Sequence, residues 1–286
     1  MRKWVDKYLA EIADINCKVK LIIADVGDFP EFSNRHPEKF INVGVSESNA
    51  VGVAAGLAST GYCVYIYGVS SFFLYRAYEQ FKYSVSYWHK NVTFIGVGFG
   101  WKYFNIGIGH FCPDDILLVQ SLPNFEIHTP YSLTQLKELL CLPSGHPRYI
   151  RLTANIVNDN AIYTISNSPF IIVCYGEMVS ACLSIVKSLN NHGHNVGILA
   201  FSYLDKSKIE DTISNYVQSK FIVIEDQCEL GGLYPILREF NVRIISHICL
   251  PLLPNLVSSS RKGLLKGYKL DEESITNKIL YIIEHE

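Results

Sequence analysis

The sequence predicts an α/β protein with two domains, each containing a mostly parallel sheet flanked by helices. Three observations predict this fold class: short apolar runs recur along the chain, amphipathic segments separate several of them, and one polar stretch interrupts the alternation. Apolar strands separated by helices are typical of parallel sheets that are covered on both faces. With 286 residues, of which 49% are apolar and 18% charged, the chain can form two cores.

The predicted strands are the apolar runs, and the predicted helices are segments whose apolar side chains recur every three or four residues. The strands are residues 19–24, 62–67, 92–97, 149–152, 170–175, 196–201, 221–224 and 244–249. The helices are the N-terminal segment 1–16, residues 178–190 and residues 209–217. The polar stretch 153–168 is rich in Asn, Ser and Thr. We therefore predict a first domain over 1–155, a linker over 156–167 and a second domain over 168–286.

The composition excludes several classes of function. The net charge is -2 and the basic residues do not cluster, so we expect no nucleic-acid surface. No apolar run reaches the ~20 residues that span a bilayer, and the N-terminus lacks the apolar core of a signal peptide. We therefore expect no membrane segment and a cytoplasmic location. The eight cysteines form no CxxC pair and predict reduced, structural thiols. His110 and Cys112 are too few for a zinc site, so we predict no metal site within this chain.

One acid stands out at the start of a predicted helix of small residues. The segment 41–61 reads INVGVSESNAVGVAAGLASTG, and Glu47 is its acid. On the residues alone, Glu47 is most simply an acid favoured by the helix dipole. Gly52 and Gly56 each cost about 1 kcal/mol relative to Ala in a helix interior. Their spacing therefore predicts that another backbone packs closely against that face.

Two further segments combine aromatic, histidine and acidic residues. SSFFLYRAYEQFKYSVSY, residues 70–87, places Phe72, Tyr75 and Tyr78 at helical spacing. On the residues alone these aromatics are most simply an ordinary core stripe, and Phe73 competes with Phe72 for the first position. GIGHFCPDDILLVQSLPNFEIHTP, residues 107–130, contains His110.

In this order, the three segments resemble motifs of transketolases and of deoxyxylulose-phosphate synthase. The family motifs are GIxEQNxVGxAAGLA, FxxxRAxxQxRxS and GxTHxxxEDxxxxRxxPNxxxxxP, and Ser48 stands where the first has Gln. Residues 146–153 resemble the end of the family's pyrimidine-binding domain. Residues 221–237 and 264–275 resemble parts of its C-terminal domain. The resemblance covers nearly the whole chain, so it implies the C-terminal half of a transketolase.

The resemblance implies a thiamine-diphosphate site. The family's acid at the Glu47 position contacts a ring nitrogen of the aminopyrimidine and promotes loss of the proton from the thiazolium carbon. Glu47 is thus implied as both catalytic and cofactor-binding. The other implied roles belong to residues that match family positions: Phe72, Tyr75 and Tyr78 around the pyrimidine ring, Asp25 near the cofactor, His110 on the donor sugar near its reacting carbon, and Arg2 on a substrate phosphate.

The family motif for the diphosphate is missing. Thiamine-diphosphate enzymes hold that group through magnesium with GDG followed at a distance by Asn, and the chain has no such motif. The chain begins where the family's second domain would begin. We therefore expect a separate N-terminal transketolase-like subunit that carries the diphosphate and most magnesium ligands. Pairs of the two chains are expected to associate into a heterotetramer.

Three positions depart from the pocket of a housekeeping transketolase. Gly98 stands for a His, Ile106 for an Asp and Ala154 for a phosphate-binding Arg. The changes remove a hydroxyl acceptor and a bidentate clamp. We therefore expect a transferase of carbohydrate biosynthesis that moves a two-carbon ketol unit on an unusual, nucleotide- or carrier-linked sugar. Two alternatives stay open: the beta subunit of a 2-oxo acid dehydrogenase and a non-catalytic transketolase paralogue.

Overall fold

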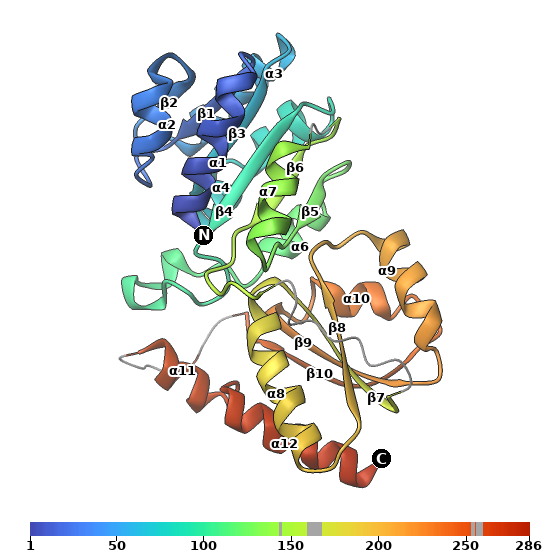
Figure 1. Cartoon of the computed structure of the whole chain (residues 1–286). Helices are drawn as coiled ribbons and strands as arrows, with labels where there is room; N and C mark the ends of the chain where they lie inside the picture. The colour runs from blue at the N-terminus through green and yellow to red at the C-terminus, as the bar shows by residue number, and fades with distance from the viewer. Residues whose placement is uncertain (143–144, 159–167, 253–254, 256–259) are drawn as a thin grey trace.

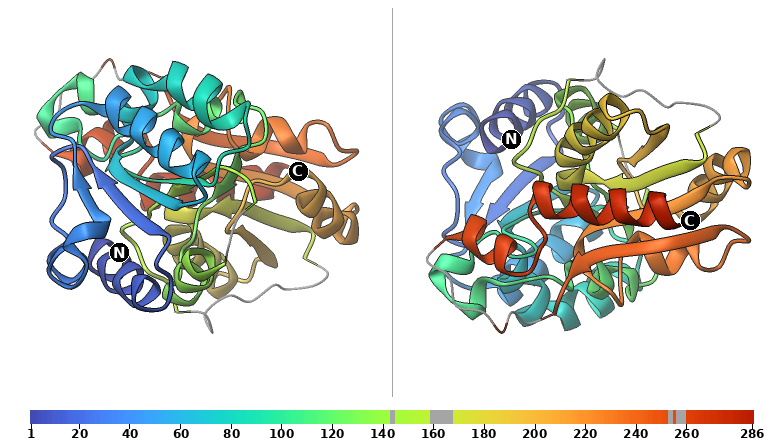
Figure 2. Two further views of the ribbon diagram at one scale, coloured as in Figure 1. Left: turned by 90° about the horizontal axis from the view of Figure 1, so that it is seen from above. Right: turned by 90° about the horizontal axis from the view of Figure 1, so that it is seen from below.

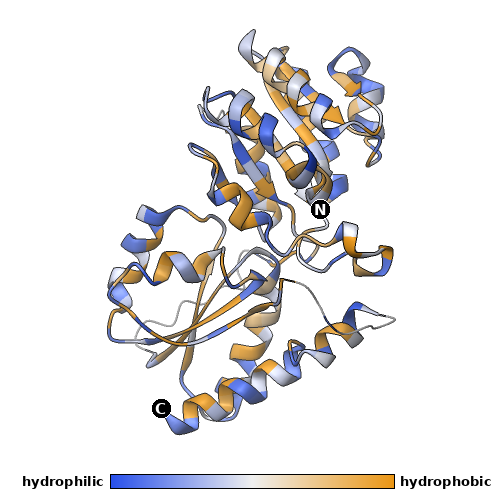
Figure 3. Ribbon diagram, turned by 180° about the vertical axis from the view of Figure 1, so that it is seen from behind, coloured by the Kyte–Doolittle hydropathy of each residue, from blue (hydrophilic) through white to orange (hydrophobic). Residues whose placement is uncertain are grey.

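The computed structural model describes residues 1–142, 145–158, 168–252, 255 and 260–286 (Figure 1). It contains a six-stranded and a four-stranded sheet, and every strand pairing within them is parallel. The strands are largely hydrophobic, whereas the helices around them have mixed surfaces (Figure 3). The predicted fold class, with two sheets flanked by helices, is confirmed.

The first sheet has the strand order β2-β1-β3-β4-β6-β5. Its strands are β1 (Val19–Ile23), β2 (Phe40–Asn42), β3 (Cys63–Val69), β4 (Val92–Val97), β5 (Glu126–His128) and β6 (Arg148–Arg151). The α-helices in this part are α1 (Arg2–Ile15), α2 (Pro30–Arg35), α3 (Glu47–Ser59), α4 (Ser70–Arg76), α5 (Tyr78–Gln80), α6 (Asp115–Gln120) and α7 (Leu133–Cys141). The shorter elements are η1 (Pro37–Lys39), η3 (Phe104–Ile106), η4 (Ile108–His110) and the π-helical η2 (Phe81–Ser86).

Each face of the first sheet has its own apolar cluster. On one face, α1 and α7 pack side chains such as Leu9 and Leu136 with Leu21 and Ile150 of the strands. On the other face, α3, α4, η2 and α6 pack over β1, β3 and β4, and Ile66 belongs to this second cluster. The N-terminal segment forms the helix that its apolar spacing predicts, because that stripe faces the sheet.

The second sheet has the strand order β10-β9-β7-β8. Its strands are β7 (Phe170–Tyr175), β8 (Val196–Phe201), β9 (Lys220–Cys228) and β10 (Arg243–Leu250). The helices of this part are η6 (Gly176–Met178), α8 (Val179–Asn191), α9 (Lys206–Ile213), η7 (Ser214–Tyr216), α10 (Leu233–Leu237), α11 (Arg261–Gly267) and α12 (Glu272–His285). α8 and α12 cover one face. Seen from below, α11 and α12 follow one another across this part of the molecule (Figure 2).

One apolar cluster extends from the first sheet to the second. It includes Ile116 and Val119 of α6 together with Val173 of β7 and Leu233 and Leu237 of α10. The cores of the two halves are therefore continuous on this side. The predicted linker 156–167 lies outside the described residues from 159 onward, and the division into two domains stays a prediction.

Two expectations differ from the structure. Strand β5 was not predicted, because its three residues alternate Glu126, Ile127 and His128 and form no apolar run. The close backbone contact predicted at Gly52 and Gly56 is wrong within this chain: a Cβ atom added at either glycine would meet nothing within 4 Å. Among the described helices, none is both long and apolar enough to cross a bilayer.

Candidate functional site

The candidate site lies at the carboxyl edge of the first sheet. The chain leaves β1 toward β2 on one side and then returns to β3 on the other, so the connections diverge between β1 and β3. In open parallel sheets, ligands bind outside the carboxyl ends of the strands at such a switch point. Asp25 follows β1, Glu47 follows β2, Phe72 follows β3 and His110 lies in the loop after β4. The fold thus brings these four predicted residues to one edge.

Glu47 is a buried acid with a guanidinium partner. It is the first residue of α3, and 6% of its surface is exposed. Arg76 Nη1 donates a hydrogen bond to Glu47 Oε1 at 2.9 Å, although half of the Arg76 side chain is exposed. From the sequence, no role was predicted for Arg76, although the family motif FxxxRAxxQxRxS has its Arg at this position, four residues after Phe72 and on the same helical face. Because its side chain is half exposed, Arg76 can move away from Glu47 without disturbing the core.

Glu47, Arg76, Phe72 and His110 form a row in which each side chain contacts the next. The Arg76 guanidinium carbon lies 4.3 Å from the centroid of the Phe72 ring. The rings of Phe72 and His110 meet edge to face with their centroids 4.8 Å apart. Phe73 points into the core, where its ring lies 5.0 Å from that of Phe94. Phe72, and not Phe73, therefore faces the candidate site.

Tyr75 and Tyr78 are turned toward α6. The Tyr75 hydroxyl donates to the Asp114 carboxylate, and burial, together with neighbouring Cys112 and Asp114, raises the pKa of Tyr75 above its ordinary value. The Tyr78 hydroxyl and Ser121 Oγ lie 2.6 Å apart. The two tyrosines thus connect the segment after β3 to α6, and their hydroxyls already have partners.

Asp25 is tied to the loop that leads to Glu47. Its backbone has a φ of 52°, a conformation that Asp and Asn tolerate better than most residues. Its N–H donates to Asn42 Oδ1 at 3.1 Å, and the N–H of Gly44 donates to the same oxygen at 3.0 Å. Asn42 therefore holds the two loops together. Arg2 begins α1 with an exposed side chain, and the N-terminal end of this helix lies at the same edge of the sheet (Figure 1).

Gly98 and Ala154, which depart from the family pattern, have structural roles. The φ of Gly98 is 73°, and a Cβ atom there would lie 2.3 Å from Cε2 of Tyr103. A larger residue at position 98 would therefore displace the Tyr103 ring. Ala154 uses its backbone N–H, which donates to Glu177 Oε2 at 2.9 Å. Ile106 ends η3, and 58% of its surface is exposed.

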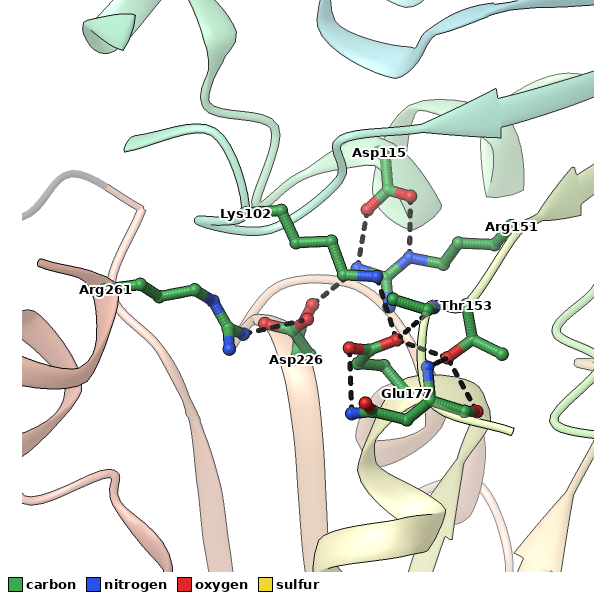
Figure 4. A network of polar contacts seen from close by, with 9 residues as sticks. Lys102, Asp115, Arg151, Thr153, Glu177, Asp226 and Arg261 are labelled. Atoms are coloured by element: carbon green, nitrogen blue, oxygen red, sulfur yellow. Dashed lines mark hydrogen bonds and ion pairs between the residues drawn. The ribbon is translucent and has the colours of Figure 1, made fainter. Parts of the chain in front are cut away.

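A buried ion pair stands between the edge of the first sheet and the second sheet (Figure 4). Arg151 donates to both oxygens of Asp115, at 2.8 Å from Nε and 3.0 Å from Nη2, and both side chains are essentially inaccessible. The Tyr149 hydroxyl donates to Asp115 Oδ2 at 2.7 Å, and Arg151 also reaches the carbonyl oxygen of Asp226. Burial raises the pKa of Asp115, and Arg151 opposes that shift. The sequence signals for this pair are the arginine inside the predicted strand 149–152 and the acidic pair of the third family motif, whose second member falls on Asp115.

A cavity of about 370 Å³ lies beside the second sheet, away from Glu47. Its walls combine apolar side chains such as Leu250, Leu265 and Ile275 with the acids Glu177 and Asp226. The predicted site residues do not line it. In the ranges that the structure describes, no group of three or more His, Cys, Asp or Glu residues is placed to hold a metal ion.

Comparisons with known proteins give the family. The model of the transketolase pyrimidine-binding domain matches residues 1–157. The chain is 26% identical to one subunit of the apulose-4-phosphate transketolase of Phocaeicola vulgatus, over 89% of this chain and 87% of that protein. It is also 26% identical to a putative transketolase C-terminal section of Methanocaldococcus jannaschii, over 98% of this chain and 95% of that protein.

Solved structures agree on the fold. A split-gene transketolase, described as an inactive beta4 tetramer, superposes with a TM-score of 0.81 at 22% identity, and the match covers 99% of this chain and 98% of that chain. A transketolase of Pichia stipitis in complex with sedoheptulose 7-phosphate superposes with the same TM-score at 16% identity; the match covers 99% of this chain and 46% of that one. With a family model that matches more than half of its residues, the chain belongs to the transketolase family, whose pyrimidine-binding domain forms its first sheet.

Proposed function

We propose that this chain is the second subunit of a two-chain, thiamine-diphosphate-dependent enzyme that transfers a two-carbon ketol unit between sugars. The observation that carries the proposal is the placement of Glu47, a buried acid at the first turn of α3, in a row with Arg76, Phe72 and His110. Membership of the transketolase family supports transferase chemistry, and relatives named as transketolase subunits support a divided enzyme.

The residues present fit one end of thiamine diphosphate. An aminopyrimidine needs a carboxyl group that is held out of water against one ring nitrogen, and Glu47 is such a group. The ring also needs an apolar contact surface, which Phe72, Tyr75 and Tyr78 are proposed to supply, with Asp25 nearby. The diphosphate and its magnesium are assigned to the partner subunit.

The proposed mechanism gives each residue one task. Thiamine diphosphate supplies the carbon nucleophile when it is bound. Glu47 exchanges its hydrogen bond from Arg76 for one with the ring nitrogen and holds the proton there. Phe72 keeps water from that contact. His110 donates a hydrogen bond to the donor sugar at the oxygen beside the reacting carbon, and Arg2 contacts a phosphate of the substrate.

The proposed assembly is a dimer of chain pairs. The M. jannaschii relative is described as a C-terminal section, and the solved split-gene transketolase as a beta4 tetramer. The face of α3 that carries Gly52 and Gly56 is open within this chain, and Trp88 beside it is 65% exposed. An open face of small residues leaves room for a second chain. A cytoplasmic location stays a prediction.

We expect thiamine diphosphate with magnesium to bind tightly only to the mixture of this chain and its partner. Calorimetric titration of this chain alone should give an affinity at least about a hundredfold weaker, or about 2.7 kcal/mol, because only the pyrimidine end finds its contacts here. The matched control is the mixture that contains the Glu47→Ala variant. Equally tight binding to this chain alone would contradict the divided site.

We expect turnover of xylulose 5-phosphate with ribose 5-phosphate to be at least about a hundredfold slower than with the true substrates, since a lost hydrogen bond or clamp costs about 1–3 kcal/mol and two are absent. The comparison should include nucleotide- and carrier-linked sugars. Apulose 4-phosphate and 6-deoxy-6-sulfo-D-fructose belong in it because relatives are named for them. Rates like those of a housekeeping transketolase would refute the changed specificity.

Two alternatives are separable from the proposal. A beta subunit of a 2-oxo acid dehydrogenase would support decarboxylation of pyruvate or a related 2-oxo acid in the assembled enzyme. A non-catalytic paralogue would assemble with the partner and show no ketol transfer. The row formed by Glu47, Phe72 and His110 favours a catalytic chain over that second alternative.

A further inference from the structure

The loop that carries His110 closes on itself at one end. It leaves β4 at Gly98 and returns at Cys112, where the N–H of Gly100 donates to the Cys112 carbonyl at 2.8 Å and the N–H of Cys112 donates back at 3.0 Å. His110 ends the short helix η4 within this loop, and its ring packs against Phe72. The position of the His110 ring therefore depends on what holds the loop.

Lys102 of this loop is anchored to the second sheet (Figure 4). Its Nζ donates to Glu177 Oε2 at 2.8 Å, and the two side chains are 13% and 6% exposed. Glu177 lies in η6, directly after β7. The same ammonium lies 4.1 Å from the centroid of the Phe99 ring, and the Arg151 guanidinium lies 3.8 Å from it. Two cations therefore contact the Phe99 ring at the base of the loop.

Glu177 also holds the segment that follows β6. Its Oε2 accepts hydrogen bonds from the Thr153 hydroxyl and from the N–H of Ala154, and its Oε1 accepts one from Asn155 Nδ2 at 3.1 Å. Burial acts to raise the pKa of Glu177, but Lys102 and these donors outweigh it, so the pKa is lowered. One carboxylate therefore connects the His110 loop, the end of the first sheet and the start of the second.

Apolar packing also fixes this loop. Trp101 is fully buried in a cluster with Phe111, Leu250 and Leu264, and its ring meets that of Tyr268 edge to face at 5.1 Å. The ion pair between Lys102 and Glu177 restricts the position of the loop further, since a buried ammonium and carboxylate tolerate little displacement from one another.

We propose that Lys102 and Glu177 are positioning residues through which the second half of the chain places His110 beside Phe72. The second sheet then takes part in the reaction without touching substrate or cofactor. The inference rests on the role proposed for His110, but the anchoring of the loop can be measured without any activity.

The first test is amide hydrogen exchange of the full chain. Lys102→Met should speed exchange over residues 98–112 by about tenfold or more, since local opening no longer breaks a buried pair, and should leave α3 unchanged. The matched control is Lys137→Met, because Lys137 pairs with Glu11 at 3.8 Å on the surface. Glu177→Gln should act like Lys102→Met. Unchanged exchange over 98–112 in both variants would overturn the anchoring.

The second test is a double-mutant cycle in the assembled enzyme. Lys102→Met should lower kcat/KM for the donor sugar by about tenfold, and Lys102→Arg should restore part of the loss. In a His110→Ala background, Lys102→Met should cause no further loss, because it acts through His110. Losses that multiply independently would overturn the positioning role. An assembled wild-type enzyme without ketol transfer would overturn the proposed function instead, and the exchange result would still decide the anchoring.

Discussion

Glu47→Gln in the assembled enzyme is expected to lower turnover by about 10²–10⁴-fold, the range of a lost general acid–base contribution. Gln preserves the shape of the side chain, but it cannot exchange a proton with the ring nitrogen of the cofactor. Assembly with the partner should persist, because Glu47 lies at the start of α3 and its bond within the chain is to the half-exposed Arg76. Steady-state ketol transfer and size-exclusion chromatography measure the two quantities.

The control for this variant is Glu210→Gln, an exposed acid on α9 in the second half of the chain. It removes the same charge far from the proposed site and should leave turnover unchanged. Arg76→Met separates the hydrogen bond between Arg76 and Glu47 from the proposed bond between Glu47 and the cofactor, because it removes the guanidinium and keeps the carboxylate. If Glu47→Gln turned over as fast as Glu210→Gln, Glu47 would have no role in the chemistry.

Arg151→Met is expected to lower the free energy of unfolding by about 3–5 kcal/mol, as found when one partner of a buried ion pair is removed. The variant would leave the Asp115 carboxylate without its two guanidinium hydrogen bonds in a place that water does not reach. The remaining donor from Tyr149 cannot replace both bonds. Urea unfolding of the full chain, followed by tryptophan fluorescence, measures the loss.

The surface pair of Lys206 and Glu239 provides the matched control. Both side chains are more than half exposed, so Lys206→Met should change stability by less than about 1 kcal/mol. Replacing Asp115 and Arg151 together by apolar residues should cost less than either single replacement, since no charge is left buried alone. A loss for Arg151→Met as small as that of Lys206→Met would contradict this account.

Local patterns were sufficient for most of the fold. Strand β4 was predicted with its observed bounds because its apolar run is continuous and buried on both faces, as were β7 and β8. Strand β5 was missed because its pairing with β6, and not its own residues, makes it a strand. Sequence periodicity describes single elements, whereas short edge strands depend on what lies beside them.

The candidate site was predictable only in part. The family motifs identified Glu47 and His110. They did not decide between Phe72 and Phe73, because that choice depends on how the helix is rotated against the sheet. Arg76 joins Glu47 across 29 positions, and Lys102 joins Glu177 across 75. Contacts over such separations follow from the packing of whole elements, and no local pattern in one sequence encodes them.

The apolar cluster that α6 shares with β7 and α10 sets a limit on how the gene for such an enzyme can be divided. A break within residues 153–168 would leave two fragments, and each would expose an apolar surface that the other fragment covers in the intact chain. Exposed patches of this kind promote aggregation before reassembly. However such an enzyme is divided into subunits, we therefore expect its two parallel sheets to be encoded together in one polypeptide.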